Sequence, residues 1–224
     1  MTQALAYSLA PILAMMLCGA LATGRRPKQV QISLFQHFAG GVVFAAVALE
    51  LIPALDRSPF LLAMTAGFLA GVGAMLLVNK FASQAGMFTP VAVDLFVDGM
   101  LLAIGFATGA KGGVVLLIGL TMETSSLGLS LAPSLGQKGF SPRKVMLFIL
   151  AAGLCIILGA GVAGTVLTAG GALFEGFLGF GVACLLYLVT EELLKEAHQS
   201  KDTPLTTASF FVGFLLSFLL ARLV

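Results

Sequence analysis

The segment PVAVDLFVDGMLLAIGFATGAKGGVVLLIGLTMETSSLGLSLAP, residues 90–133, decides the fold. Each half is about 20 mostly apolar residues long, the length of a membrane-spanning helix, and a short turn at Gly109–Gly113 would join the halves. Asp94 and Asp98 interrupt the first half and Glu123 the second. Asp94 and Asp98 are four residues apart, so a helix places both on the same face. Because a carboxylate at mid-bilayer costs at least ~2.5 kcal/mol and generally serves an ion or proton path, the segment predicts a functional site.

The whole chain is too apolar for a soluble domain. Of its 224 residues, 59% are hydrophobic and 10% are charged, and the mean hydropathy is +1.07. This composition is typical of a helical protein that crosses the membrane several times. The net charge of +2 gives no reason to expect a nucleic-acid partner. We interpret Cys18, Cys155 and Cys184, each inside an apolar segment, as small core residues rather than as a disulfide or metal ligands.

Hydropathy predicts one all-α transmembrane domain over residues 1–224, with eight spans. The first span lacks a basic residue before its apolar run and has Arg25 after it. This order indicates a retained first helix rather than a cleaved signal peptide. The predicted spans are about 4–23, 31–54, 60–79, 90–109, 113–133, 145–169, 172–195 and 205–223.

Basic residues are distributed unequally between the two sides that these spans define. The loops after the first, third, fifth and seventh spans hold Arg25, Arg26, Lys28, Lys80, Lys138, Arg143, Lys144, Lys195 and Lys201. The opposite side holds only Arg57, Lys111 and Arg222. The positive-inside rule therefore places the first group in the cytoplasm and both termini outside. We expect a multi-pass protein of the inner, cytoplasmic membrane.

A weak internal repeat relates the second and seventh spans. FQHFAGGVVFAAVALELIPAL (35–55) and FEGFLGFGVACLLYLVTEELLKEA (174–197) both begin F-x-x-F-x-G and carry E-L-[IL] near their ends. Because the two segments would cross the membrane in opposite directions, residues of about 1–80 and 145–224 would form inverted repeats around the helix pair at 90–133. Inverted repeats are common in transporters, where the substrate site lies between them.

Several residues beside the three acids are further candidate ligands. We expect no Lys or Arg at the depth of Asp94, Asp98 and Glu123. A bound cation or a shared proton would then explain the acids, and the alternative is a protonated acid that a hydroxyl or a carbonyl holds. Met122 could add a thioether, and Ser126 shares the helix face of Glu123. The Ser and Thr hydroxyls of this segment could instead bond back to helix carbonyls.

Further titratable residues fall near the ends of spans. Glu50 lies at the outer end of the second span, and Glu191 and Glu192 lie at the inner end of the seventh. These three are candidate vestibule residues of a pathway, or acids that simply reach water. His37 and His198 fall at cytoplasmic helix ends, where a solvated side chain and a transient exit ligand are alternatives.

The order of these motifs resembles the ZIP (Zrt/Irt-like) family of divalent-metal transporters. Residues 94–99, DLFVDG, stand where the family carries H-N-x-P-[ED]-G in span 4, and residues 122–127, METSSL, stand at its [HQ]-[END]-x-P-[EH]-G/E motif in span 5. The flanks GMLLAIGFATG and GLSLAPSLGQKGFSPRK, and the span ends ALELIPAL and TEELLKEA, also resemble the family and align Glu50 with Glu192. The resemblance covers nearly the whole chain. It implies eight spans, outside termini, an inverted three-helix repeat and metal ligands on spans 4 and 5.

This sequence departs from the family pattern at the ligands. Neither motif keeps a histidine, Val97 and Ser125 replace the prolines, and Ser126 replaces an acid that bridges two metals. Leu95 and an acid-free span 6 remove further ligands, and the segment Asn79–Thr89 has no counterpart of the family's His-rich loop. We therefore expect one metal site instead of two. Its candidate ligands are Asp94, Asp98, Met122, Glu123 and Ser126.

These residues favour a transporter over an enzyme. Carboxylate ligands shift preference from a His-built zinc site toward Mn²⁺, Fe²⁺, Mg²⁺ or Ca²⁺, although Zn²⁺ still binds carboxylates. We expect a ZIP-type permease with Zn²⁺, Mn²⁺ or Fe²⁺ as its substrate, no bound cofactor and no use of ATP, working by alternating access. Membrane lipid is an expected partner, and a homodimer is a candidate assembly. The alternatives are a proton-coupled transporter of another solute, whose acids carry protons, and a non-transporting metal sensor or assembly partner.

Overall fold

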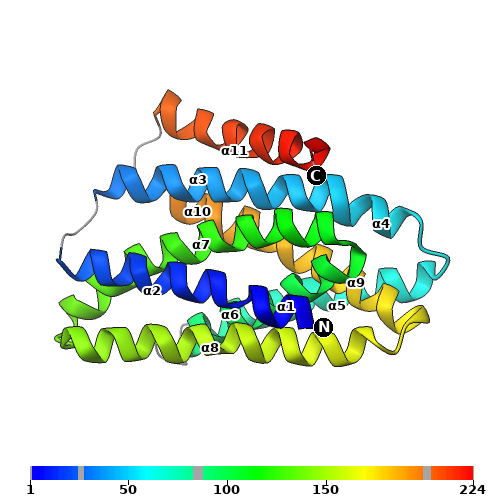
Figure 1. The fold of residues 1–224 in the computed structure, drawn as a ribbon, viewed down its shortest axis with the longest axis horizontal. Coiled ribbons are helices and arrows are strands. Elements are labelled where there is room, and N and C mark those ends of the chain that lie inside the picture. Colours follow the sequence, from blue (N-terminus) through cyan, green and yellow to red (C-terminus); the bar gives the residue numbers. More distant parts are fainter. Residues whose placement is uncertain (1, 25–27, 83–87, 199–202, 224) are drawn as a thin grey trace.

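The computed structural model describes residues 2–24, 28–82, 88–198 and 203–223, which form an all-helical bundle (Figure 1). Arg25, Arg26 and Lys201, which contribute to the charge asymmetry of the sequence, and residues 83–87 of the loop Asn79–Thr89 lie outside the described residues. The helices are α1 Thr2–Tyr7, α2 Leu9–Gly24, α3 Gln29–Ala46, η1 Val47–Leu51, α4 Ile52–Asp56, α5 Leu61–Ala82, α6 Phe88–Thr108, α7 Ala110–Gln137, α8 Pro142–Leu167, α9 Gly171–Tyr187, η2 Leu188–Leu193, α10 Leu194–Ala197 and α11 Pro204–Leu223.

The prediction of eight spans is confirmed, because eight helical segments are long and apolar enough to cross a membrane. The chain is therefore a multi-pass helical membrane protein. The observed segments are Ala4–Thr23, Gln29–Asp56, Leu61–Lys80, Phe88–Thr108, Ala110–Gln137, Pro142–Leu167, Gly171–Leu193 and Pro204–Leu223.

Successive spans run in opposite directions, so the bundle has two ends (Figure 1). At one end, here called the Lys80 end, α2, α5, α7 and α10 finish and α3, α6, α8 and α11 begin. At the other, the Gly109 end, α6 passes into α7. The closest helix pairs are α2 with α7, α3 with α11, α5 with α9 and α6 with α8. Glycine permits the last of these contacts, since a Cβ built on Gly99 of α6 would lie only 1.9 Å from the carbonyl oxygen of Ile156 of α8.

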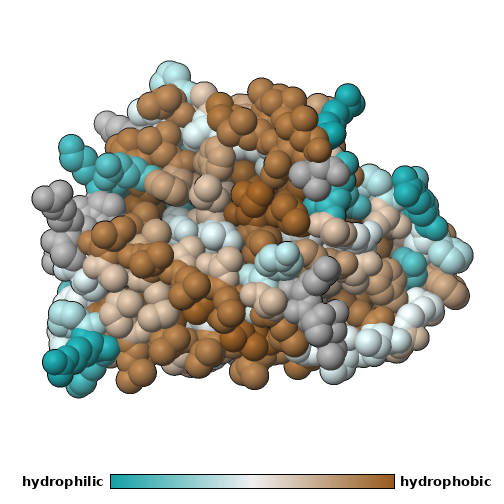
Figure 2. Space-filling view, in the orientation of Figure 1, coloured by the Kyte–Doolittle hydropathy of each residue, from teal (hydrophilic) through white to brown (hydrophobic). Residues whose placement is uncertain are grey.

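The surface of the bundle is typical of a protein surrounded by lipid. Large apolar side chains such as Leu62 and Leu69 of α5 and Phe211 of α11 are exposed, and Figure 2 shows apolar residues along the middle of the bundle, with hydrophilic residues gathered toward its two ends. The described basic residues of the Lys80 end are Lys28, Lys80, Lys138, Arg143, Lys144 and Lys195, and those of the Gly109 end are Arg57, Lys111 and Arg222.

The turn between α6 and α7 is shorter than the predicted turn at Gly109–Gly113. α6 ends at Thr108 and α7 begins at Ala110, so that only Gly109 separates them. Gly109 has a backbone φ of +147°, which residues other than glycine rarely adopt. The reversal therefore needs one residue, and Lys111 lies in the first turn of α7. At its other end, α7 continues through Pro133 to Gln137, beyond the predicted end.

The first span is interrupted, which the hydropathy pattern does not predict. Ser8 separates α1 from α2, and its hydroxyl donates to the carbonyl oxygen of Leu5 at 2.7 Å. Pro11 follows three residues later. Because proline has no N–H, it cannot donate to the carbonyl of Tyr7, and its ring displaces that carbonyl. The break follows from this missing bond.

Spans two and seven each contain a π-helical segment, which was also not predicted. In η1 the ladder shifts to i→i−5, since the Ile52 N–H donates to the Val47 carbonyl. In η2 the Leu194 N–H donates to the Val189 carbonyl in the same way. π-Helical segments interrupt the regular i→i−4 hydrogen bonding of a helix, and they occur frequently at functional sites. Here η1 contains Glu50, and η2 contains Glu191 and Glu192.

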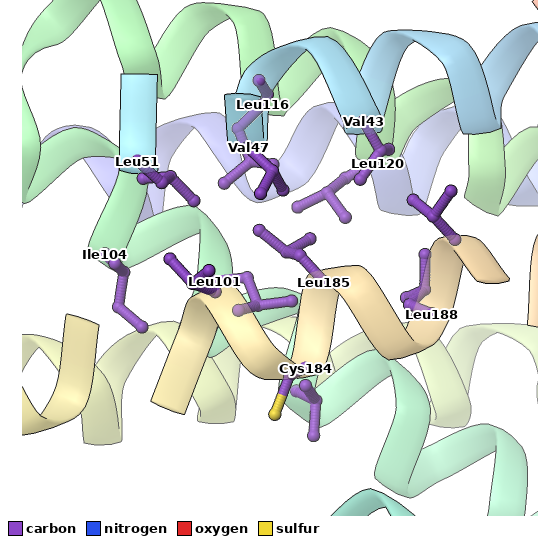
Figure 3. Close-up of a cluster of buried hydrophobic side chains, with 14 of the residues drawn as sticks. Val43, Val47, Leu51, Leu101, Ile104, Leu116, Leu120, Cys184, Leu185 and Leu188 are labelled. Carbon is purple, nitrogen blue, oxygen red and sulfur yellow. The ribbon is translucent and has the colours of Figure 1, made fainter. Parts of the chain in front are cut away.

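A core cluster of apolar side chains fills the middle of the bundle and extends past Asp98 toward the Gly109 end. It is formed by residues of α3, η1, α5, α6, α7, α9 and η2, several of which are drawn in Figure 3. The core cluster includes Val43, Val47, Leu51, Leu101, Ile104, Leu116, Leu120 and Leu185, all at most 2% exposed. Tight packing of this kind leaves little room for water or an ion.

Candidate metal site

Three acids from two adjacent helices meet inside the bundle. Asp94 and Asp98 lie on α6 and Glu123 on α7, and one carboxylate oxygen from each lies within 4.8 Å of the others. Asp98 is ten residues from either end of α6, which spans Phe88–Thr108, and therefore stands at its middle. The three acids thus form one group at mid-helix depth.

Asp98 is the most buried of the three acids. It is 1% exposed, against 6% for Glu123, whereas Asp94 is half-buried. Neither carboxylate oxygen of Asp98 has a hydrogen-bond partner among the described residues. The alternative of a protonated acid held by a hydroxyl or a carbonyl therefore finds no support at Asp98. A buried carboxylate without hydrogen bonds is strongly unfavourable unless it binds a cation or a proton.

The spacing of these oxygens suits a single divalent cation. Two oxygens on opposite sides of an ion with bonds of about 2.1–2.5 Å lie roughly 4–5 Å apart. The 4.8 Å separation in the cluster is within that limit, so small side-chain rotations would bring all three oxygens onto one ion. An all-oxygen set is the kind that Mn²⁺, Mg²⁺ and Ca²⁺ prefer, and carboxylates also bind Zn²⁺ and Fe²⁺.

The hydroxyls that follow Glu123 divide into two groups. Thr124 donates to the carbonyl of Pro11 or Thr121, each at 3.2 Å, and Ser125 donates to the carbonyl of Thr121 at 2.6 Å. For these two, the interpretation that hydroxyls bond back to carbonyls is confirmed. Ser126 differs, because its hydroxyl is buried at 1% exposure and has no partner among the described residues.

Ser126 is therefore the hydroxyl best placed to join the acids. It lies three residues after Glu123 on α7, so the two side chains share one face. Met122 is half-buried, and no described contact brings its sulfur to the cluster. Met122 as a ligand stays a prediction.

A cavity of about 360 Å³ leads from the Lys80 end toward the acids. Its lining residues come from the end of α5, the start of α6, one turn of α7, and η2 with α10. They are Met75, Val78, Asn79, Pro90, Val91, Val93, Asp94, Val97, Leu127, Glu191, Glu192 and Lys195. Asp94 thus belongs both to the cavity wall and to the acidic cluster.

The two acids of η2 lie in the wall of the cavity, and their role as vestibule residues stays a prediction. Glu191 is exposed and Glu192 half-buried, and both line the cavity. Glu192 also lies close enough to Asp98 for their charges to interact. Glu50 has no comparable position: it is half-buried in η1, its Cβ beside Gly112 of α7, and it does not line this cavity.

Sequence reasoning missed two polar residues of the cavity wall. Asn79 lines the cavity and donates from its side-chain amide to the hydroxyl of Tyr187 at 2.6 Å. Lys195 lines the same cavity as Asp94, whereas the expectation that no Lys or Arg lies at the depth of the three acids stays a prediction. Helical spacing could have indicated Lys195 as a neighbour of Glu191, since it lies four residues after that acid.

The two histidines lie together, apart from the cavity wall. Their ring centres are 5.1 Å apart. His198 is exposed, whereas His37 is only 3% exposed. The solvated alternative was therefore wrong for His37, because α10 packs over the start of α3.

Comparison of the sequence with protein-family models and with curated proteins finds no match.

Proposed function

We propose that the protein is a membrane permease for a divalent metal cation, with Asp94, Asp98 and Glu123 as the substrate site. One observation carries the proposal: Asp98 is 1% exposed at the middle of α6, and neither of its oxygens has a hydrogen-bond partner among the described residues. Two further acids approach within 4.8 Å. A divalent cation would offset the repulsion among the three charges and replace the water that each carboxylate loses on burial.

The cavity supports access to this site from one end at a time. It reaches Asp94 from the Lys80 end. Beyond Asp98, α6 continues with Leu101, Leu102 and Ile104, each 0% exposed. The described conformation would therefore admit an ion from the Lys80 end, and transport would need a second conformation that opens the Gly109 end. Such alternating access needs no ATP.

The helix contacts support the inverted repeat that the sequence suggests. The repeat would superpose spans 1–3 on spans 6–8 and α6 on α7. Under this superposition, the contact between α2 and α7 corresponds to the contact between α8 and α6. The contact between α3 and α11 likewise corresponds to the contact between α9 and α5. All four pairs are among the closest contacts of the bundle. The same superposition relates η1 to η2, and therefore Glu50 to Glu192. The substrate site would then lie between the repeats, as in other transporters with this symmetry.

The proposed orientation puts the Lys80 end in the cytoplasm and both termini outside. Six of the described basic residues lie at that end and three at the other, as the positive-inside rule requires. With the motif order of the sequence, these features favour a ZIP-type transporter of the inner membrane, without enzymatic activity. Compared with a zinc site built from histidines, a single site of oxygen ligands would shift the ion preference toward Mn²⁺ or Fe²⁺.

Uptake of Mn²⁺ into proteoliposomes tests the proposal. Asp98→Asn keeps the shape of the side chain and removes its charge, so we expect uptake to fall at least ~10-fold, as is typical when a metal site loses a key group. Asp56→Asn is the matched control, because Asp56 is an exposed acid outside the cluster, and it should leave uptake unchanged. Equal uptake by the Asp98→Asn variant and the unchanged protein would refute the proposal.

A second candidate function is proton-coupled transport of another solute. The missing motif histidines favour it, since the acids of the cluster could carry protons without a metal. In this case a pH gradient alone would drive proton flux through the protein, and Asp98→Asn would abolish that flux. Mn²⁺ would neither be transported nor stabilise the protein against heat.

A further inference from the structure

Gln36 of α3 is a buried polar residue whose side-chain oxygen has nothing to bind. It lies two turns into the helix and is 2% exposed. Its Oε1 atom has no hydrogen-bond partner among the described residues. A buried amide oxygen in this state is unfavourable, because it has given up its water without gaining a donor. Its position therefore indicates a ligand that comes from outside the chain.

The contacts between α3 and α7 fix the level of this side chain in the bundle. The two helices run in opposite directions and pack along each other. A Cβ built on Gly119 of α7 would lie 2.8 Å from Cγ2 of Val43. Glu50 comes seven residues after Val43, and a Cβ built on Gly112, seven residues before Gly119, would lie 3.3 Å from its Cβ. The two contacts define one register, in which each step along the second span matches an equal step back along α7.

The same register places Gln36 opposite Ser126. Gln36 lies seven residues before Val43, and Ser126 lies seven residues after Gly119. Seven residues are close to two helical turns, so the side chains keep nearly the same direction while both positions move about 10.5 Å toward the Lys80 end. Both stretches are regular α-helix. The amide of α3 and the hydroxyl of α7 therefore face each other across the helix contact.

Buried oxygens without hydrogen-bond partners from three helices thus gather at one level. Ser126 is 1% exposed, and its hydroxyl lacks a partner in the part of the chain that the structure describes, as Oε1 of Gln36 does. Ser126 shares its helix face with Glu123. A carboxylate oxygen of Glu123 lies within 4.8 Å of one of Asp98 on α6. One cation at this level would serve the amide, the hydroxyl and the acids together.

We propose that Gln36 is a ligand of the cation bound by the acidic cluster, to which it contributes a neutral amide oxygen from α3. This assignment rests on the proposed function, since the ion is the one that Asp94, Asp98 and Glu123 hold. Amide oxygens of Asn and Gln are regular ligands of hard cations. Gln36 adds such an oxygen without adding a fourth negative charge, which would repel the three acids.

The extra oxygen makes Gln36 a determinant of ion selectivity. Mn²⁺, Mg²⁺ and Ca²⁺ take six or more oxygen ligands, whereas Zn²⁺ is generally bound by four ligands. A neutral oxygen beyond those of the acids therefore strengthens the binding of Mn²⁺ more than the binding of Zn²⁺. Without Gln36, the site should lose much of its preference between the two ions.

Equilibrium binding of Mn²⁺ and of Zn²⁺ to the full-length protein in detergent tests the assignment. Gln36→Leu removes the oxygen, so we expect the Mn²⁺ affinity to fall at least ~10-fold, as is typical when a metal site loses a supporting group, and the Zn²⁺ affinity to fall less. Gln36→Glu keeps an oxygen in place and should bind Mn²⁺ at least as tightly as the unchanged protein. Gln31→Leu is the matched control on α3, because Gln31 is exposed and its oxygen accepts from the backbone N–H of Lys28. It should leave both affinities unchanged.

Thermal unfolding of the metal-free proteins separates a ligand from a structural residue. Gln36→Leu replaces an amide whose oxygen is unpartnered among the described residues with an apolar side chain. The variant should therefore be at least as stable as the unchanged protein. A clearly less stable or unfolded Gln36→Leu would overturn the assignment, because the amide would then serve the fold.

The remaining outcomes separate this assignment from the permease proposal. Unaltered Mn²⁺ binding by Gln36→Leu, together with lost binding in Asp98→Asn, would overturn the role of Gln36 and leave the permease proposal standing. Equal losses of Mn²⁺ and Zn²⁺ affinity in Gln36→Leu, or weakened Mn²⁺ binding in Gln36→Glu, would also overturn the role of Gln36. Absence of Mn²⁺ binding by the unchanged protein would overturn both proposals.

Discussion

The two halves of α6 differ in what surrounds them. The half toward the Lys80 end carries Asp94 and Asp98, and the cavity reaches it. The half toward the Gly109 end carries Leu101 and Ile104, both fully buried in the core cluster (Figure 3). One continuous helix therefore passes from a polar, accessible region into dry packing within about one turn. Under the proposed function, the substrate site would therefore be open toward one side of the membrane and closed toward the other.

The largest expected effect is a difference in chemical access between these halves. In a variant without Cys18, Cys155 and Cys184, we expect Val93→Cys in the cavity wall to react with a water-soluble thiol reagent on the order of 100-fold faster than Leu102→Cys, because thiol reactivity follows exposure. Val93 lines the cavity and Leu102 is 0% exposed. Labelling rates in vesicles of the two orientations measure this ratio.

Val93→Cys should react only in vesicles that expose the Lys80 end to the reagent, and Mn²⁺ should slow the reaction. Similar rates for the two cysteines would contradict closure of the core half. Faster labelling of Val93→Cys from the Gly109 end would contradict the proposed direction of access.

The next prediction is that substitutions in the two halves of α6 change the free energy of unfolding in opposite directions. Leu101→Ala leaves a cavity in the core cluster and should lower the free energy of unfolding by about 2–5 kcal/mol. Asp98→Asn removes a buried charge and adds an amide that can donate to the neighbouring acids. Without metal it should therefore raise the stability, by roughly 1–2 kcal/mol.

Thermal unfolding in detergent, with and without Mn²⁺, measures both changes. Mn²⁺ should stabilise the unchanged protein and Leu101→Ala but not Asp98→Asn, since a ligand that binds only the folded state raises its stability. A metal-free Asp98→Asn variant as unstable as Leu101→Ala would show that Asp98 is a structural residue.

The smallest effect is expected at the edge of the acidic cluster. Ser126 has a buried hydroxyl without a partner among the described residues, whereas the hydroxyl of Ser125 bonds to Thr121. If Ser126 contributes one contact to the ion or to its water, Ser126→Ala should cost about 0.5–1 kcal/mol, or roughly 2- to 5-fold in Mn²⁺ affinity. Ser125→Ala is the matched control and should leave affinity unchanged, so equal losses in both variants would remove Ser126 from the site.

Much of the fold could be predicted because membrane insertion constrains the sequence directly. A run of about 20 apolar residues must form a helix that satisfies its own backbone, and this is why the eight spans are confirmed. Helical periodicity likewise predicts that Asp94 and Asp98 share a face. Glu123 could be predicted as well, since an acid inside a membrane span is costly and generally has a functional role.

The remaining features depend on contacts between helices or on single backbone angles. The one-residue turn at Gly109 follows from its positive φ, which hydropathy does not encode. The π-helical segments η1 and η2 add one residue to a turn without altering composition. Burial of His37 and the approach of Lys195 to the cavity both depend on where η2 and α10 pack. Sequence periodicity describes one helix at a time and leaves such packing undetermined.

Anomalous diffraction from crystals grown with Mn²⁺ tests the central claim most directly. We predict one strong manganese peak between α6 and α7, about 2.1–2.2 Å from carboxylate oxygens of Asp98 and of at least one of Asp94 and Glu123, as expected for a hard divalent ion. A dry acidic cluster with no peak at saturating Mn²⁺, or with manganese bound only at the surface, would contradict a cation site at mid-membrane.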